Sequence, residues 1–99
     1  MAADLSFEWD SRKALANRRK HGVSFEEARE AFADEQGLLL HDPDHSDDED
    51  RFVLLGLTAA QNLLVVCHCH RGSDEVIRIS SARKANRQEG ANYRARWTP

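Results

Sequence analysis

Apolar and polar residues follow one another in patterns that predict both strands and helices in this chain. Leu5 to Trp9 alternates apolar with polar residues and is short, which indicates an edge strand. Asp10 follows as the expected N-cap of a first helix over Ser11 to Lys20. Gly22 then supplies the left-handed conformation that commonly closes a helix.

A second helix start follows closely. Ser24 and Glu27 have the spacing of a capping box, in which each side chain bonds a backbone N–H of the other residue. Phe25, Ala28 and Phe32 recur at i, i+3 and i+7, which gives an otherwise acidic helix one apolar stripe. We interpret this stripe as core.

From Gly37 the period changes from helix to strand. Gly37 to His41 is predicted to be a strand, and the near-continuous apolar runs Arg51 to Thr58 and Asn62 to His70 are predicted to be central antiparallel strands. A turn then leads to the alternating stretch Val76 to Ser80. The last three strands are therefore expected to form an antiparallel meander.

The end of that last strand predicts a binding site. Ser80 or Ser81 is expected to cap a helix from Ala82 to Ala95, since that stretch has no proline and one glycine. Cations crowd the predicted helix start, where the helix dipole is already positive, so local stability does not explain them. Two readings remain open: an anion site, most plausibly for phosphate, or solvated cations that pair with carboxylates elsewhere. The cations concerned are Arg78, Arg83, Lys84 and Arg87.

Length and composition narrow the class of protein. At 99 residues, 40% of them hydrophobic and 31% charged, the chain is expected to be one folded domain over residues 1–99. No apolar run approaches the ~20 residues of a membrane span, and the N-terminus lacks the features of a signal peptide. We therefore expect a cytoplasmic protein with no membrane partner. Cys67 and Cys69, two residues apart on a strand, are poorly placed for a disulfide.

The net charge of −3 hides a segregated distribution. Residues 11–21 carry five cations and no acid, whereas residues 42–50 carry six acids and no Lys or Arg. Residues 71–96 are again rich in Arg and Lys. Basic ends therefore flank an acidic middle, which is compatible with an anion-binding face.

Two segments resemble metal sites. In the run Cys67 to His70, strand geometry sends the two cysteines to one face and His68 and His70 to the other, so four ligands cannot meet at one ion. The acidic segment around His45 lacks the glycine and glutamate spacing of a helix–loop–helix calcium site. We expect no metal and no cofactor. Buried cysteines with surface imidazoles, and a solvated loop, are the ordinary interpretations.

Three motifs resemble those of the BrnT family of bacterial toxins, in the same order and at similar spacing. They are Phe7-Glu8-Trp9-Asp10, then Lys20-His21-Gly22-Val23-Ser24-Phe25-Glu26-Glu27-Ala28, then Val76-Ile77-Arg78-Ile79-Ser80-Ser81-Ala82-Arg83-Lys84-Ala85, with Glu89 and Tyr93 following. The similarity spans about Phe7 to Tyr93. The acidic segment and the Cys-His-Cys-His run depart from the usual pattern, so nothing is carried over to them.

The resemblance implies an α+β fold similar to RelE ribonuclease toxins, with two N-terminal helices, a curved, mostly antiparallel sheet of four to five strands and a C-terminal helix. It also implies a type II toxin that cleaves RNA and inhibits translation. The implied partner is a BrnA-like antitoxin whose ribbon–helix–helix domain binds operator DNA. Two toxins and two antitoxins are expected in the complex, which would contact DNA through the antitoxin.

We assign roles on this basis as a hypothesis. Cleavage without metal by the 2′-hydroxyl needs a base, cations for the phosphorane charge, and an acid. Arg78 and Arg83 are the predicted charge stabilisers. Lys20 or His21 would transfer a proton or contact phosphate, and Tyr93 would stack on a base or donate a proton. The predicted RNA-binding residues are Lys13, Lys84 and Arg87.

Two alternatives stay open: a non-catalytic RNA- or protein-binding module of the same fold, and a structural domain whose basic face matches an acidic antitoxin.

Overall fold

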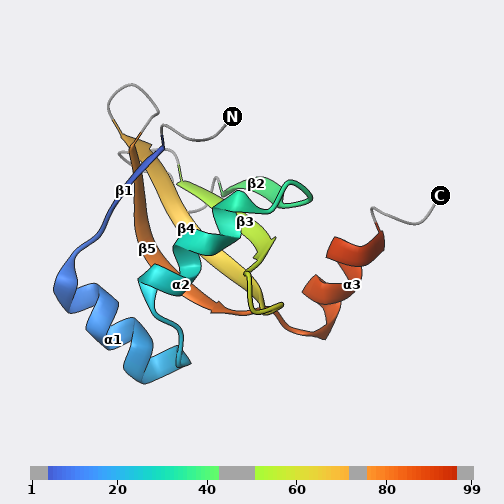
Figure 1. Ribbon diagram of the computed structural model, residues 1–99, viewed down its shortest axis with the longest axis horizontal. Coiled ribbons are helices and arrows are strands. Elements are labelled where there is room, and N and C mark those ends of the chain that lie inside the picture. Colours follow the sequence, from blue (N-terminus) through green and yellow to red (C-terminus); the bar gives the residue numbers. More distant parts are fainter. Residues whose placement is uncertain (1–4, 43–50, 72–75, 96–99) are drawn as a thin grey trace.

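A computed structural model describes residues 5–42, 51–71 and 76–95 of the chain. Within these ranges the chain forms three α-helices and five strands, whose arrangement can be followed in Figure 1. The predicted α+β class is therefore confirmed. The elements are β1 (Ser6–Glu8), α1 (Ser11–His21), α2 (Phe25–Glu30), the short 3-10 helix η2 (Ala31–Ala33), β2 (Leu38–Asp42), β3 (Arg51–Leu57), β4 (Leu63–Arg71), β5 (Val76–Lys84) and α3 (Arg87–Ala95).

The five strands form one mixed sheet in the order β1-β5-β4-β3-β2. β1 pairs parallel to β5, and the other three neighbouring pairs are antiparallel. The predicted edge position of the first strand and the predicted meander of the last three strands are both confirmed. The short β1 covers just the first three residues of β5, Val76 to Arg78, and leaves the rest of that edge to another element.

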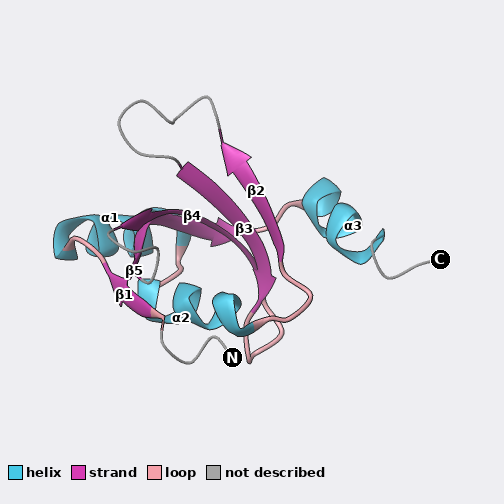
Figure 2. Ribbon diagram, turned by 90° about the horizontal axis from the view of Figure 1, so that it is seen from above, coloured by secondary structure: helices cyan, strands magenta, loops and turns pink. Residues whose placement is uncertain are grey.

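Helices pack on both sides of this sheet. α2 and η2 cover one face, where Phe25, Ala28 and Ala31 are fully buried against strand residues such as Leu64 and Val66. α3 lies toward the other face, as Figure 2 shows. There its Tyr93 packs in a smaller apolar cluster with Leu55 and Val65. The two faces of the sheet are therefore covered differently: α2 packs over one face, and α3 covers one end of the other face.

α1 fills the part of the β5 edge that β1 leaves open. Its Asn17 is buried, and its side-chain amide accepts a hydrogen bond from the Ala82 backbone N–H and donates to the Ala82 carbonyl, at 3.0 and 2.8 Å. The same Nδ2 donates to the Val23 carbonyl at 3.0 Å. The amide thus replaces a neighbouring strand at Ala82 and satisfies backbone groups that would otherwise be buried without partners. α1 is fixed along β5 by this contact.

The expected helix start at Ser80–Ala82 is wrong. β5 continues to Lys84, and α3 begins at Arg87. Ala82, Arg83 and Lys84 are good helix formers, but pairing with β4 and the bonds from Asn17 outweigh that local preference. Arg83 and Lys84 therefore belong to a strand, and the helix dipole is not part of the site around Arg78.

Candidate nucleic-acid interface

The two faces of β4 can be told apart by what its residues contact. Leu64 and Val66 pack in the core under α2, whereas Val65 packs with Tyr93 of α3. Side chains alternate along a strand, so Cys67 and Cys69 lie on the same face as Val65, opposite α2.

A β-bulge brings the two predicted catalytic arginines to that same face. Cys67 pairs with Ser81 and His68 pairs with Ile79, so Ser80 is an extra residue in β5. Arg78 and Arg83 are five residues apart and would point to opposite faces of a regular strand. With one extra residue between them, they point to the same face. We call this surface, opposite α2, the basic face; its members are Arg51, Cys67, Cys69, Arg78, Ser81 and Arg83.

A small hollow of about 80 Å³ lies at the Arg78 end of the basic face. Lys13 of α1, Arg51 of β3 and Arg78 of β5 line it. Arg51 pairs with Cys69, and Cys69 pairs with Arg78, so the two arginines lie on either side of one short side chain. Three cations from three separate elements therefore surround one depression; His68, Cys69 and Ser80 line the rest of it.

Arg78 is held by a carboxylate of β1. Its Nη1 donates to Glu8 Oε2 at 2.9 Å, and Arg71 Nε lies 3.6 Å from the same oxygen. These side chains are about one third to one half exposed, so the pairing adds little to stability and serves to orient the guanidinium. A guanidinium has five N–H donors, and within the described residues Arg78 spends one of them on Glu8. Several donors remain for an anion.

Arg83 is held more tightly, by Glu89 of α3. Two parallel hydrogen bonds of 2.8 and 2.7 Å join the guanidinium to the carboxylate. These bonds lower the pKa of the Glu89 carboxyl and raise the pKa of the Arg83 guanidinium. Glu89 also accepts from the Asn86 backbone N–H at 2.9 Å, while Asn86 Oδ1 accepts from the Glu89 N–H at 2.8 Å. This reciprocal pair is a capping box that starts α3.

The structure therefore places Arg78 and Arg83 on one face but does not bring their guanidinium groups together. Arg78 is drawn toward Glu8 of β1 and Arg83 toward Glu89 of α3. Both arginines have acidic partners in the same chain, as the second of the two interpretations of the sequence expects. An anion must share or displace these carboxylates.

The predicted residues of α1 lie along β5 in order. Lys13 lines the hollow beside Ser80, and Asn17 bonds Ala82. Lys13, Asn17 and Lys20 recur at i, i+4 and i+7, which is one side of a helix. Lys20 is exposed and lies about 10 Å beyond Lys13 along the helix axis, toward the Arg83 end of β5. His21 ends the helix and is half-buried.

The other predicted residues lie away from the hollow. Tyr93 is 3% exposed, and its hydroxyl donates to Asp34 Oδ2, so its position is that of a packing residue. Lys84 pairs with Leu64 and therefore points to the opposite face from Arg83. Arg87 is exposed at the first residue of α3.

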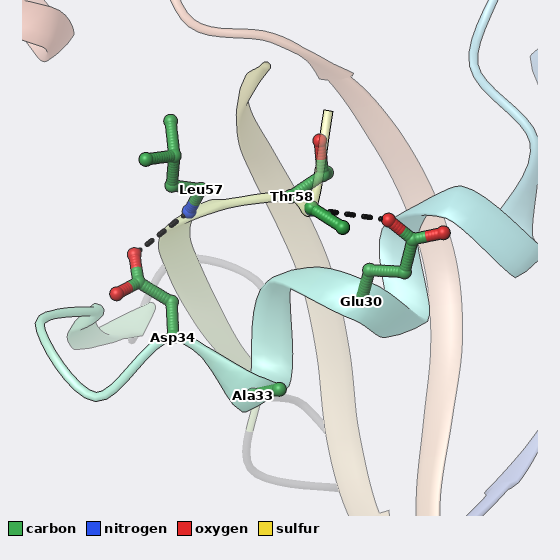
Figure 3. A pocket seen from close by; sticks show the side chains of 6 residues that line it. Glu30, Ala33, Asp34, Leu57 and Thr58 are labelled. Carbon is green, nitrogen blue, oxygen red and sulfur yellow. Dashed lines mark hydrogen bonds between the residues drawn. The ribbon is translucent and has the colours of Figure 1, made fainter. Parts of the chain in front are cut away.

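A larger hollow of about 310 Å³ lies elsewhere, between η2 and the end of β3 (Figure 3). Its charged lining residues are both acidic, Glu30 and Asp34. Asp34 accepts from the Leu57 backbone N–H at 2.8 Å, and Glu30 accepts from the Ala59 N–H at 3.2 Å. Both carboxylates thus hold the chain that leaves β3. Their charge does not suit a phosphate, so the smaller hollow is the better candidate for RNA.

The histidines and cysteines of β4 lie on opposite faces of the sheet, as predicted, and the histidines lie on the α2 side. His68 is 1% exposed and packs edge-on against Phe32, with ring centroids 4.8 Å apart. Burial lowers its pKa to about 4, although a hydrogen bond to the Val66 carbonyl acts in the other direction. His68 is therefore a neutral core residue at neutral pH, and the expected surface imidazole is wrong at this position.

No three side chains of His, Cys, Asp or Glu within residues 5–42, 51–71 and 76–95 are grouped to hold a metal ion. In the same ranges, no helix has the length and apolar character that crossing a membrane requires. The acidic segment around His45 lies outside the described residues.

Two features of the site were missed by the sequence analysis. Arg51 was assigned to a strand without a role, because strand register, which sets it beside Cys69 and Arg78, cannot be derived from the pattern alone. The start of α3 had a usable signal: Asn86 and Glu89 have capping-box spacing, and this motif identifies the helix start better than the serines at 80 and 81 do.

Comparisons with known proteins bear on the family and the fold of the chain. The family model described as the ribonuclease toxin BrnT of type II toxin–antitoxin systems matches residues 9–89. The crystal structure of the Brucella abortus ribonuclease toxin BrnT superposes with a TM-score of 0.61 at 21% sequence identity, over 84% of this chain and 99% of that one. At that identity the likeness concerns the fold. No curated protein sequence matches. The extent of the family match shows that the chain belongs to the BrnT family of ribonuclease toxins of type II toxin–antitoxin systems.

Proposed function

We propose that this protein cleaves RNA on the basic face, by attack of a ribose 2′-hydroxyl on the adjacent phosphate and without a metal ion. The observation that carries the proposal is the bulge at Ser80, which turns Arg83 to the same face as Arg78, and Arg78 shares a hollow on that face with Lys13 and Arg51. Clustered cations offset the charge that builds up on the phosphorane. Membership of a ribonuclease toxin family supports the reaction class.

The roles follow from position. Arg78 and Arg83 supply positive charge to the RNA backbone. Lys13 contacts phosphate from α1, and Arg87 attracts RNA from the start of α3. Lys84 is left out, because it points to the opposite face from Arg83. Lys20 or His21, at the end of α1, transfers a proton or contacts a further phosphate of the RNA. Tyr93 is left out, because its hydroxyl is engaged with Asp34.

We further propose that cleavage inhibits translation in the cytoplasm and that a BrnA-like antitoxin neutralises the toxin. The type II family implies a protein antitoxin. We expect that antitoxin to carry a ribbon–helix–helix domain, and we expect a complex of two toxins with two antitoxins. DNA would be contacted through the antitoxin. The competing reading, a module that binds RNA without cutting it, is separated by the following experiment.

The test is incubation of the purified protein with single-stranded RNA in EDTA, followed by analysis of the new ends. In the proposed reaction the 2′-oxygen bonds to phosphorus and the bond to the 5′-oxygen breaks, which leaves a 2′,3′-cyclic phosphate and a 5′-hydroxyl. The new 5′ ends are thus expected to accept label from a polynucleotide kinase without prior phosphatase treatment. A 2′-deoxy substitution at the cut position serves as the control and is expected to block cleavage. Shifted but intact RNA would establish the binding module instead.

A further inference from the structure

The hollow on the basic face has the features of a site for one phosphoryl group. Lys13, Arg51 and Arg78 come from α1, β3 and β5, so no single element explains their convergence. Arg51 and Arg78 lie two strand spacings apart, about 10 Å between backbones, which leaves room for an anion between two long side chains. Cys69, the residue between them, is short and 9% exposed. Two guanidinium groups and an ammonium thus border one depression.

Arg83 cannot belong to the same hollow. Its backbone lies up to about 16 Å from that of Arg78 along β5. Two of its donors are also bound by Glu89, and Nη1 additionally contacts the Lys84 carbonyl at 3.3 Å. Arg78, by contrast, spends one donor on Glu8. The cations that bind the reacting phosphate are therefore those around Arg78.

We propose that Lys13, Arg51 and Arg78 together hold the phosphate at the cleaved bond, and that Arg51 is thereby a catalytic residue of this enzyme. This assignment rests on the proposed ribonuclease function. Arg83 then binds a neighbouring phosphate of the same strand. Planar guanidinium groups on two sides suit the equatorial oxygens of a phosphorane, and Lys13 adds a point charge from the third side.

The experiment compares RNA cleavage by the wild-type protein and by Arg51→Ala, with Arg29→Ala as the matched control. Arg29 is an exposed arginine of α2, on the side of the sheet that α2 covers. Its replacement by alanine changes the net charge by the same amount as Arg51→Ala. We expect Arg51→Ala to lower kcat about 100-fold, as for removal of one donor to a developing anion, and Arg29→Ala to stay within about twofold. Arg83→Ala is expected to act mainly by raising KM.

Failure of this inference differs from failure of the proposed function. If Arg51→Ala cuts RNA as fast as Arg29→Ala while Arg78→Ala does not, Arg51 has no catalytic role and the ribonuclease assignment survives. If the wild-type protein cuts no RNA, the proposed function is lost. Phosphate binding in the hollow is then tested separately, by titrating inorganic phosphate into ¹⁵N-labelled protein. Shifts of the Cys69 and Ser80 amides that Arg51→Ala abolishes would support a phosphate site there, and unchanged spectra would overturn it. Thermal unfolding of each variant confirms that it is folded.

Discussion

Replacing Arg78 with alanine is expected to lower the rate of RNA cleavage by two to three orders of magnitude. Its guanidinium lines the hollow between Lys13 and Arg51, and it keeps donors beyond the one bonded to Glu8. Removing one preorganised donor to a developing anion typically costs ~10²–10³ in rate, or ~2.7–4 kcal/mol of transition-state stabilisation. The measurement is kcat and KM on a short single-stranded RNA in EDTA.

Two controls keep this result interpretable. Arg78→Lys retains a charge but not the planar fork, so it should recover part of the lost rate. Glu8→Gln leaves the arginine in place and removes its carboxylate partner, so the hollow becomes more positive. We expect this variant to bind RNA at least as tightly as the wild type. A fully active Arg78→Ala protein would exclude the basic face as the reaction site.

The second large effect concerns stability and pH. The pKa of His68 is lowered from 6.5 to about 4 because the ring is buried under Phe32. As pH falls below 6.5 the unfolded chain gains a proton at this residue that the folded protein does not accept until about pH 4. The free energy of unfolding should therefore fall over this window by about 3 kcal/mol from His68 alone, and the loss should level off below it.

Urea unfolding at pH 7 and pH 4 measures this effect, with His68→Leu as the reference. Leucine has no titrating group and suits the apolar surroundings of the ring. The wild type should lose about 3 kcal/mol more than the variant between the two pH values, since both share every other titrating group. Equal losses would mean that His68 is protonated in the folded state or that its burial carries no energetic cost.

Local patterns predicted much of the fold. The N-caps Asp10 and Ser24, the left-handed Gly22 and the apolar stripe of α2 are signals that act within a few residues, and the structure contains each of them. The alternation in β1 and at the start of β5 predicted strands for the same reason. These features depend on neighbours in the sequence, so the sequence suffices to find them.

The last part of β5 shows where local reasoning fails. Ala82, Arg83 and Lys84 are good helix formers, yet they are held in a strand by β4 and by Asn17, which lies 65 positions away from Ala82 in the chain. A bulge in the pairing of β5 with β4 sets the direction of Arg83. Sequence alone identified arginines 78 and 83 as a pair but not their separation, because bulge position and register are set by tertiary pairing.

The arrangement of the site could not be predicted from the sequence for similar reasons. Arg51 reaches the hollow through the pairing of three strands, and Tyr93 is removed from it by a contact with Asp34, 59 positions away. Both outcomes depend on residues far apart in sequence. The sequence analysis also did not identify Glu8 and Glu89 as the acidic partners, although both belong to the motifs that resemble BrnT toxins.

The most direct test of the basic face is to map where RNA binds. A single-stranded RNA methylated at each 2′-oxygen lacks the attacking hydroxyl and stays intact, so its binding can be followed by amide chemical shifts of ¹⁵N-labelled protein. We expect the largest shifts at Arg51, Cys69, Arg78 and Ser80, with the amides of α2 unchanged. Shifts confined to α2, or none at saturating RNA, would contradict the assignment of RNA to the face opposite α2.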